Sequence, residues 1–293
     1  MASADLIFDA GAKLGESPVW SAAQGVLYWV DIDGRAVHAF DPETGVDRKW
    51  DTDGKPTALA TTADPGRLLV AVDVGIAWLN LDTGDVTPWM SLEEPQPNVR
   101  LNDGRTDPAG RFWVGGIYDP TSAMQYVSYL HRVEPDGSFT TVRDHVGCAN
   151  GMAFSPDGKT MYWAETLDKT VFAYDYDVDT GERHNERVFA EFGSAGLPGK
   201  PDGAAVDETG CYWVACVGGS AVARITPNGH IDRVVDVPVV RPTMPAFGGP
   251  DLDTMYITSI GVRDPEKDGP GPHGGIFVFD PGVAGLPEPL FAG

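Results

Sequence analysis

A repeated pair of short strands separated by a turn glycine constrains the fold of this chain more than any other feature. The glycine, followed by aromatic or β-branched residues, occurs at Gly25, Gly66, Gly110, Gly158 and Gly210, with spacings of 41, 44, 48 and 52 residues. A sixth copy begins near Leu252, with its glycine moved upstream. Periods of about 20 to 50 residues are typical of solenoids and propellers, so this repeat decides the architecture.

Four short strands can be read in each copy of the repeat. A second strand runs into another turn, as in VHAFDPETG (37–45) and IFVFDPG (276–282), a third precedes the turn glycine, and a fourth lies between copies. Six copies predict an all-β fold, a six-bladed β-propeller in which residues 1–293 form one domain around a central channel. A β-sandwich is the alternative, but it has no reason to repeat at about 45 residues. The strand around Leu6, Ile7 and Phe8 is expected to close the ring by pairing with the last blade.

The charge of the chain excludes several classes of partner. It has 21 Lys and Arg against 43 Asp and Glu, a formal net charge of −22. Nucleic acids and anionic membranes attract basic surfaces, so neither is expected as a partner. The first residues lack a signal peptide's basic and apolar regions, and no apolar run approaches about 18 residues, which predicts a cytoplasmic protein. A self-closed ring needs no partner to cover its edges, which favours a monomer.

Polar residues recur where the innermost strand of a blade meets the central channel. Counting back eight residues from a turn glycine gives Asn102, Asn150 and Asp202, and Glu16 stands nine residues before the first one. Each residue alone is typical of a turn. Together they bring carboxylate and amide oxygens from four blades to one channel mouth. Such donors, without His or Cys, predict a divalent cation, namely Ca²⁺, Mg²⁺ or Mn²⁺, with Zn²⁺ and Fe²⁺ also compatible with an open site.

Other catalytic patterns are missing from the sequence. It contains no GxSxG elbow for a nucleophilic serine, no HExxH or His-x-His for a histidine-bound metal, and no phosphate-binding glycine loop. Arg100, two residues before Asn102, faces the same side of an extended segment and adds a positive charge near the expected site. These observations disfavour nucleophilic serine and organic-cofactor chemistry.

Four motifs resemble one known family over nearly the whole chain. They are GESPVW (15–20), RLNDGRTDPAGRFWVGG (100–116), ANGMAFSPDGKTMYWAET (149–166) and PDGAAVDETGCYWVA (201–215). In this order they resemble the family of gluconolactonase, regucalcin (senescence marker protein) and the luciferin-regenerating enzyme. The resemblance implies a six-bladed propeller that hydrolyses a small-molecule sugar lactone to the aldonic acid with one divalent metal ion.

The resemblance also implies roles for individual residues. The metal ligands would be Glu16, Asn150 and Asp202, and the substrate-binding residues would be Arg100 and Asn102. Asp202 would in addition act as general base and acid, while the metal polarises the lactone carbonyl. Some members carry another substrate-contacting acid after the GRFWVGG segment, where this chain has Asp119.

Two other functions suit the same pattern. A propeller with a central cation can hydrolyse phosphotriesters, as in the squid-type diisopropylfluorophosphatase, or serve as a non-enzymatic calcium-binding protein. The sequence leaves open which lactone and which metal are used. Loops 91–99, 118–127, 192–200 and 262–274 are expected to cover the channel mouth and to set specificity.

Overall fold

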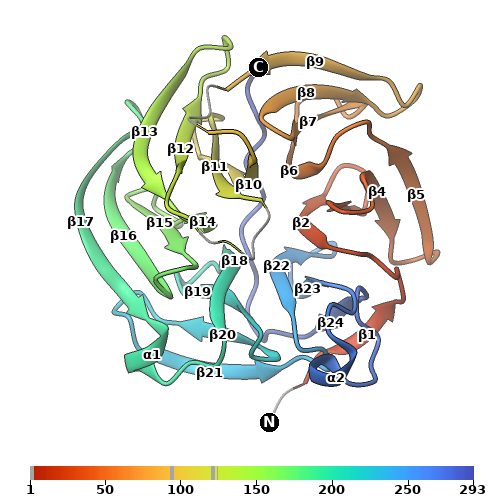
Figure 1. The fold of residues 1–293 in the computed structure, drawn as a ribbon, viewed down its shortest axis with the longest axis vertical. Coiled ribbons are helices and arrows are strands. Elements are labelled where there is room, and N and C mark those ends of the chain that lie inside the picture. The colour runs from red at the N-terminus through yellow and green to blue at the C-terminus, as the bar shows by residue number, and fades with distance from the viewer. Residues whose placement is uncertain (1–2, 93–95, 120–122, 124) are drawn as a thin grey trace.

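The computed structural model describes residues 3–92, 96–119, 123 and 125–293. The strands form six four-stranded antiparallel sheets arranged as blades around an axis (Figure 1). The predicted six-bladed β-propeller is confirmed. The helices of the described residues are α1 (Phe192–Ala195) and α2 (Pro265–Asp268), each a single turn. No helix in this part of the chain has the length and apolar character needed to cross a membrane.

The blades follow one another in sequence. Blade 1 consists of β2 (Gly15–Ser21), β3 (Val26–Asp31), β4 (Ala36–Asp41) and β5 (Val46–Asp51). Blade 2 consists of β6 (Pro56–Thr61), β7 (Arg67–Val72), β8 (Gly75–Asn80) and β9 (Val86–Ser91). Blade 3 consists of β10 (Val99–Thr106), β11 (Phe112–Tyr118), β12 (Ser128–Val133) and β13 (Phe139–Val146).

The second half of the ring repeats this order with one exception. Blade 4 consists of β14 (Ala149–Phe154), β15 (Thr160–Glu165), β16 (Thr170–Asp177) and β17 (Glu182–Glu191). Blade 5 consists of β18 (Lys200–Val206), β19 (Tyr212–Val217), β20 (Ala221–Ile225) and β21 (Ile231–Asp236). Blade 6 consists of β22 (Pro242–Gly248), β23 (Thr254–Ser259), β24 (Ile276–Phe279) and, from the other end of the chain, β1 (Asp5–Phe8).

Strand β1 closes the ring, as the sequence predicted. Leu6 pairs with Phe277 and Phe8 with Ile276, antiparallel to β24. The Phe8 ring stacks on Phe40 of blade 1, with 4.8 Å between centroids. The N-terminal strand therefore completes the last blade and also contacts the first one.

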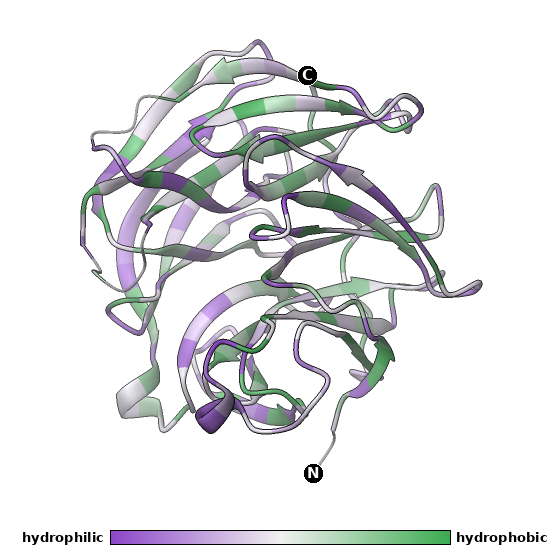
Figure 2. Ribbon diagram, turned by 45° about the vertical axis from the view of Figure 1, so that its right-hand side comes forward, coloured by the Kyte–Doolittle hydropathy of each residue, from purple (hydrophilic) through white to green (hydrophobic). Residues whose placement is uncertain are grey.

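Burial falls from the axis outward. All seven residues of β2 are buried, and so are all six of β3, whereas β5 on the rim has none buried. Along many strands hydrophobic and hydrophilic residues alternate (Figure 2). Inner strands are covered on both faces by neighbouring blades, which explains continuous runs such as VLYWVD.

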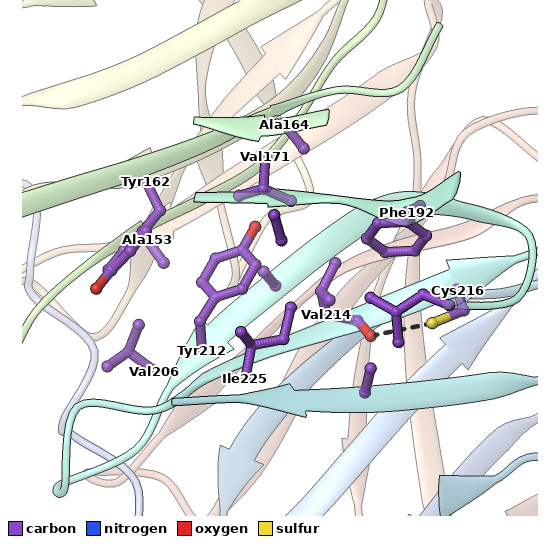
Figure 3. Close-up of a cluster of buried hydrophobic side chains, with 14 of the residues drawn as sticks. Ala153, Tyr162, Ala164, Val171, Phe192, Val206, Tyr212, Val214, Cys216 and Ile225 are labelled. Atoms are coloured by element: carbon purple, nitrogen blue, oxygen red, sulfur yellow. Dashed lines mark hydrogen bonds between the residues drawn. The ribbon is translucent and has the colours of Figure 1, made fainter. Parts of the chain in front are cut away.

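The hydrophobic core lies between the blades. Figure 3 shows the cluster between blades 4 and 5, where Tyr162 and Tyr212 lie with ring centroids 5.1 Å apart. The buried Tyr212 hydroxyl donates a 2.7 Å hydrogen bond to the carbonyl of Gly151, on the innermost strand of blade 4. Packing between blades thus fixes the backbone beside the channel.

An aspartate at the tip of two inner hairpins explains the recurring glycine. Asp207 accepts hydrogen bonds from the Cys211 backbone N–H at 3.0 Å and from Trp213 Nε1 at 2.9 Å. Asp107 of blade 3 is bonded in the same way to Arg111 and Trp113. These turns need a residue with positive φ, which glycine adopts readily, and φ is 83° at Gly110 and 86° at Gly210.

The C-terminal segment crosses one end of the channel, behind the ring in Figure 1. Gly285 forms a bridge with Asp207, and Phe291 with Thr62, both near the ends of innermost strands. Glu288 forms a 2.6 Å ion pair with Arg105. This segment covers the mouth opposite the starts of the innermost strands.

Candidate active site

Every innermost strand carries a β-bulge close to the channel. A bulge leaves residues unpaired and turns their side chains away from the regular alternation. In blades 1 and 4, Glu16 and Asn150 are the last paired residues before the bulge. In blades 3 and 5, Asn102 and Asp202 lie within the bulge. Counting back from the turn glycine predicted that Asn102, Asn150 and Asp202 occupy the same position in their blades. The strand register shows instead that Asn150, like Glu16, is paired and lies just before the bulge, whereas Asn102 and Asp202 lie inside it.

The bulges bring all the predicted site residues to one pocket. The pocket has a volume of about 520 Å³ and lies at the channel mouth opposite the C-terminal segment. Its polar lining includes Glu16, Arg100, Asn102, Asp119, Asn150 and Asp202. Three of the four expected loops also contribute, through Asp119, Lys200 and Arg263. Residues 93–95, 120–122 and 124 of these loops lie outside the described residues.

Arg100 is held by its neighbours on the pocket wall. Its Nη1 donates to Asn102 Oδ1 at 2.8 Å and to the Leu101 carbonyl at 2.9 Å, and its Nε donates to Asp119 Oδ2 at 3.3 Å. Asp119 Oδ2 also accepts from Lys55 Nζ at 2.7 Å. Although burial works in the opposite direction, Lys55 and Arg100 lower the pKa of Asp119. Asp119 is thus an ionised anchor for two cations.

The two asparagines are oriented by a continuous hydrogen-bond chain. Asn102 Nδ2 donates to Asn150 Oδ1 at 3.0 Å, and Asn150 Nδ2 donates to Thr166 Oγ1 at 2.8 Å. The Thr166 hydroxyl in turn donates to the Pro201 carbonyl at 2.8 Å. The Asn150 amide is therefore oriented with its nitrogen toward Thr166 and its oxygen toward Asn102. The chain joins blades 3, 4 and 5.

Three buried carboxyl groups, of which Glu16 and Asp202 line the pocket, influence one another's pKa values. Burial, followed by the charges of Asp202 and Asp103, raises the pKa of Glu16 well above its ordinary value. Burial and the charge of Asp103 likewise raise the pKa of Asp202. Burial raises the pKa of Asp103 itself to about 6. Like charges in a buried channel repel each other, so this group of acids calls for a positive partner.

The oxygens present fit a divalent cation. Asp103 is 3% exposed, and its Oδ1 has no hydrogen-bond partner among the described residues. Within the described ranges no three His, Cys, Asp or Glu side chains are grouped to hold an ion by themselves. The Asn150 amide oxygen would therefore complete a set with Glu16 and Asp202. Such a set of oxygens suits hard cations such as Ca²⁺ or Mg²⁺.

Several residues of this site were not predicted from the sequence, among them Asp103, Thr166 and Lys55. Asp103 directly follows Asn102 in the NDG motif, and its acidic side chain was a signal that could have been used. Thr166 ends the MYWAET motif, and Lys55 directly precedes β6. No sequence pattern at either position predicts the hydrogen bond of Thr166 to Asn150 or that of Lys55 to Asp119. Cys148, which also lines the pocket, is a buried free thiol whose pKa is raised by burial and by nearby carboxylates. It is therefore poorly suited to be a nucleophile.

Replacing Thr166 by Val should weaken cation binding about tenfold, because the Asn150 amide loses the partner that orients it. Isothermal titration of Mn²⁺ into chelator-treated protein measures this effect independently of catalysis. Thr170→Val is the matched control, since the Thr170 hydroxyl donates to the Asp168 carbonyl in the same blade and bonds no other described residue. Equal affinities in both variants would show that Thr166 does not orient a ligand.

The cation-free protein should become more stable as the pH falls from about 7 to about 5. Glu16, Asp103 and Asp202 have raised pKa values in the folded state, so the folded protein binds more protons than the unfolded chain in this range. For Asp103 the window lies between about 6 and the unfolded value near 4. Thermal melts in chelator check this trend, and Asp103→Asn should reduce the slope. A melting temperature that falls steadily over the same range would contradict it.

The fold and the site together define a six-bladed propeller with a buried acid and amide cluster at one channel mouth. Residues 14–261 match the family described as SMP-30/Gluconolactonase/LRE-like region. The chain belongs to this family, as the four sequence motifs predicted.

Individual relatives match over nearly their full length. The chain is 37% identical over 286 residues to the 6-deoxy-6-sulfogluconolactonase of Pseudomonas putida, covering 96% of this chain and 95% of that protein. It is 35% identical over 288 residues to the pentonolactonase of Haloferax volcanii, covering 96% of each. The structure of a calcium-binding protein, regucalcin, from Agrobacterium tumefaciens is similar with a TM-score of 0.89 and 29% identity, over 99% of this chain and 97% of that one.

Proposed function

We propose that this protein is a carboxylic-ester hydrolase that opens a sugar lactone to the aldonic acid. One observation carries the proposal: Glu16, Asn150 and Asp202 meet Arg100 and Asn102 in a single pocket of about 520 Å³. The family and two relatives named as lactonases support the same reaction. A pocket of this size accommodates a single sugar ring.

A divalent cation would be held by Glu16, Asn150 and Asp202. When bound, it would supply a Lewis acid that polarises the lactone carbonyl and stabilises the developing oxyanion. The mutual repulsion of the buried acids supports this assignment. The Agrobacterium regucalcin, described as a calcium-binding protein, makes Ca²⁺ one candidate.

Asp202 would move the proton during hydrolysis. Its carboxylate would take a proton from the attacking water and return it to the ring oxygen as that oxygen leaves. A base works best when its pKa lies near the working pH. Burial raises the pKa of Asp202 in the cation-free protein, and a bound cation would act in the opposite direction.

Arg100 and Asn102 would bind the sugar. Arg100 is 7% exposed and is fixed by Asp119, so its guanidinium is oriented before the substrate arrives. Asp119 Oδ2 already accepts from Arg100 and Lys55. We therefore assign Asp119 the positioning of these two cations, with its other oxygen available to a sugar hydroxyl.

A pH-stat assay on five- and six-membered aldonolactones tests the proposal. Chelator-treated protein would receive Ca²⁺, Mg²⁺, Mn²⁺, Fe²⁺ or Zn²⁺ one at a time, with paraoxon as the phosphotriester alternative. The account predicts cation-dependent acid release from at least one lactone above the spontaneous rate. Paraoxon hydrolysis without lactone turnover would indicate a phosphotriesterase. Cation binding without either reaction would indicate a non-enzymatic calcium-binding propeller.

A further inference from the structure

The rim of the pocket gathers positive charge in an acidic protein. Five of the 21 Lys and Arg residues line this one pocket, although the chain carries a net charge of −22. These five residues are Lys55, Arg100, Lys200, Arg241 and Arg263. A local cluster of positive charge attracts anionic ligands, even on a molecule whose net charge is negative.

Part of this charge is neutralised within the protein. Asp119 binds Arg100 and Lys55, while Asp33 binds Lys55 and Arg263. Although burial acts against ionisation, Arg263 and Lys55 lower the pKa of Asp33, so it is charged at neutral pH. On this side of the pocket, two carboxylates therefore face three cations.

Two further cations of the rim, Arg241 and Lys200, are less well neutralised. Arg241 directly precedes β22, and its Nη1 bonds the fully buried side chain of Asp268. Asp268 also accepts the backbone N–H groups of Arg263 and Asp264, which fixes it in place. The other guanidinium nitrogens of Arg241 have no partner among the described residues. One guanidinium nitrogen of Arg241 is thus bonded to Asp268, and the guanidinium is available to a ligand in the pocket that Arg241 lines.

Lys200 differs from the other four rim cations, because its side chain pairs with no residue in the part of the chain that the structure describes. It is half-buried at the start of β18, two residues before Asp202, and lines the pocket. Among the residues that the structure describes, its ammonium has no hydrogen bond and no ion pair, including with Asp202. A half-buried charge without a partner is unfavourable unless a ligand or water satisfies it. Strands β18 and β22 are in contact, so Lys200 and Arg241 belong to the same side of the pocket.

We propose that Lys200 and Arg241 form a subsite for an anionic substituent on the sugar, a phosphate, sulfate or carboxylate group remote from the lactone carbonyl. The proposal rests on the proposed function, since it places the ring of the sugar lactone over Asp202. Glu16 and Asp202 also line the pocket and would be balanced by the divalent cation of the proposed function. Counting Asp33, Asp119 and Asp268 against the five rim cations then leaves two positive charges. Two charges match the dianion of a phosphate monoester and exceed what a neutral sugar needs.

Binding of stable sugars tests the subsite without any turnover. Isothermal titration would compare glucose with glucose 6-phosphate, glucose 6-sulfate and glucuronate. We expect at least one anionic sugar to bind about tenfold or more tightly than glucose, and Lys200→Met to remove that difference. Because the Lys200 side chain has no hydrogen-bond or ion-pair partner among the described residues, this variant should keep its fold. Lys49→Met, which makes the same change of charge on the outer strand β5, should retain the preference.

Equal affinities for glucose and every anionic sugar, or an unaltered preference in Lys200→Met, would overturn the subsite. An equal loss in Lys49→Met would also overturn it, because the effect would then come from net charge. The comparison among the three anions decides which group is bound.

Turnover provides a second readout. The ratio of kcat/KM for 6-phosphoglucono-1,5-lactone to that for glucono-1,5-lactone should fall at least about tenfold in Lys200→Met. Hydrolysis of neutral lactones without any preference would leave the proposed function standing and remove the anion subsite. If no lactone is hydrolysed with any cation, the proposed function fails, and the binding experiment still decides the subsite.

Discussion

Asp202→Asn is expected to lose about a thousandfold of lactone turnover while the protein stays folded. Removing a general base has effects of about a hundredfold to ten-thousandfold. The substitution also removes a buried charge that Glu16 and Asp103 disfavour, so thermal stability should be unchanged or higher. Initial rates at saturating cation and lactone, with a thermal melt of the same sample, measure both quantities.

The assignment of the base needs a control for cation loss, because Asp202 is also a proposed ligand. Asparagine keeps one oxygen donor, so titration of the cation into Asp202→Asn shows whether the site still fills. Asp33→Asn serves as the charge control at the rim of the same pocket and should lose less than about tenfold. An Asp202→Asn variant that binds the cation and turns over within about tenfold of the wild type would remove Asp202 from the role of base.

Deletion of residues 1–10 is expected to lower the melting temperature by about 10 °C or more. The deletion removes β1 from blade 6, exposes the edge of β24 and takes Phe8 from its stacking contact with Phe40. The lost strand pairing and apolar burial should reduce the free energy of unfolding by several kcal/mol, on the order of the loss that lowers the melting temperature of a domain of about this length by about 10 °C. Calorimetry of the truncated chain checks the expectation.

Leu6→Ala is the control for this deletion. Leu6 lies on the same strand but is 42% exposed, so its truncation should change the melting temperature by only about 2 °C. The open edge of β24 should also make the truncated protein prone to association. If the truncated chain had the same melting temperature as the full-length protein, β1 would not be needed to close the ring.

The ring could be predicted from the sequence because one structural unit is repeated six times. The turn glycines stand where Asp107 and Asp207 build hairpin tips, and the aromatic strands stand where both faces of a sheet are covered. The C-terminal segment could not be predicted. Its residues have no strand periodicity, and Glu288 is placed by a contact with Arg105, 183 positions earlier in the chain.

The candidate site was predictable in its residue types and less so in its geometry. The oxygens of Glu16, Asn150 and Asp202 recur near the turn glycines, so counting found them. The bulges that shift Asn150 relative to Asn102 depend on pairing with the next strand, which no local motif reports. The hydroxyl of Thr166 orients Asn150 only because two blades meet there.

Titration of a single cation into chelator-treated protein, with lactone hydrolysis followed in the same samples, tests the central claim most directly. The account predicts no turnover above the spontaneous rate without the cation and a rise that saturates at one equivalent. Glu16→Gln should require a higher cation concentration to reach the same fraction of its maximum. Full turnover in the chelated protein, unaffected by added cation, would contradict a cation-dependent lactonase site at Glu16, Asn150 and Asp202.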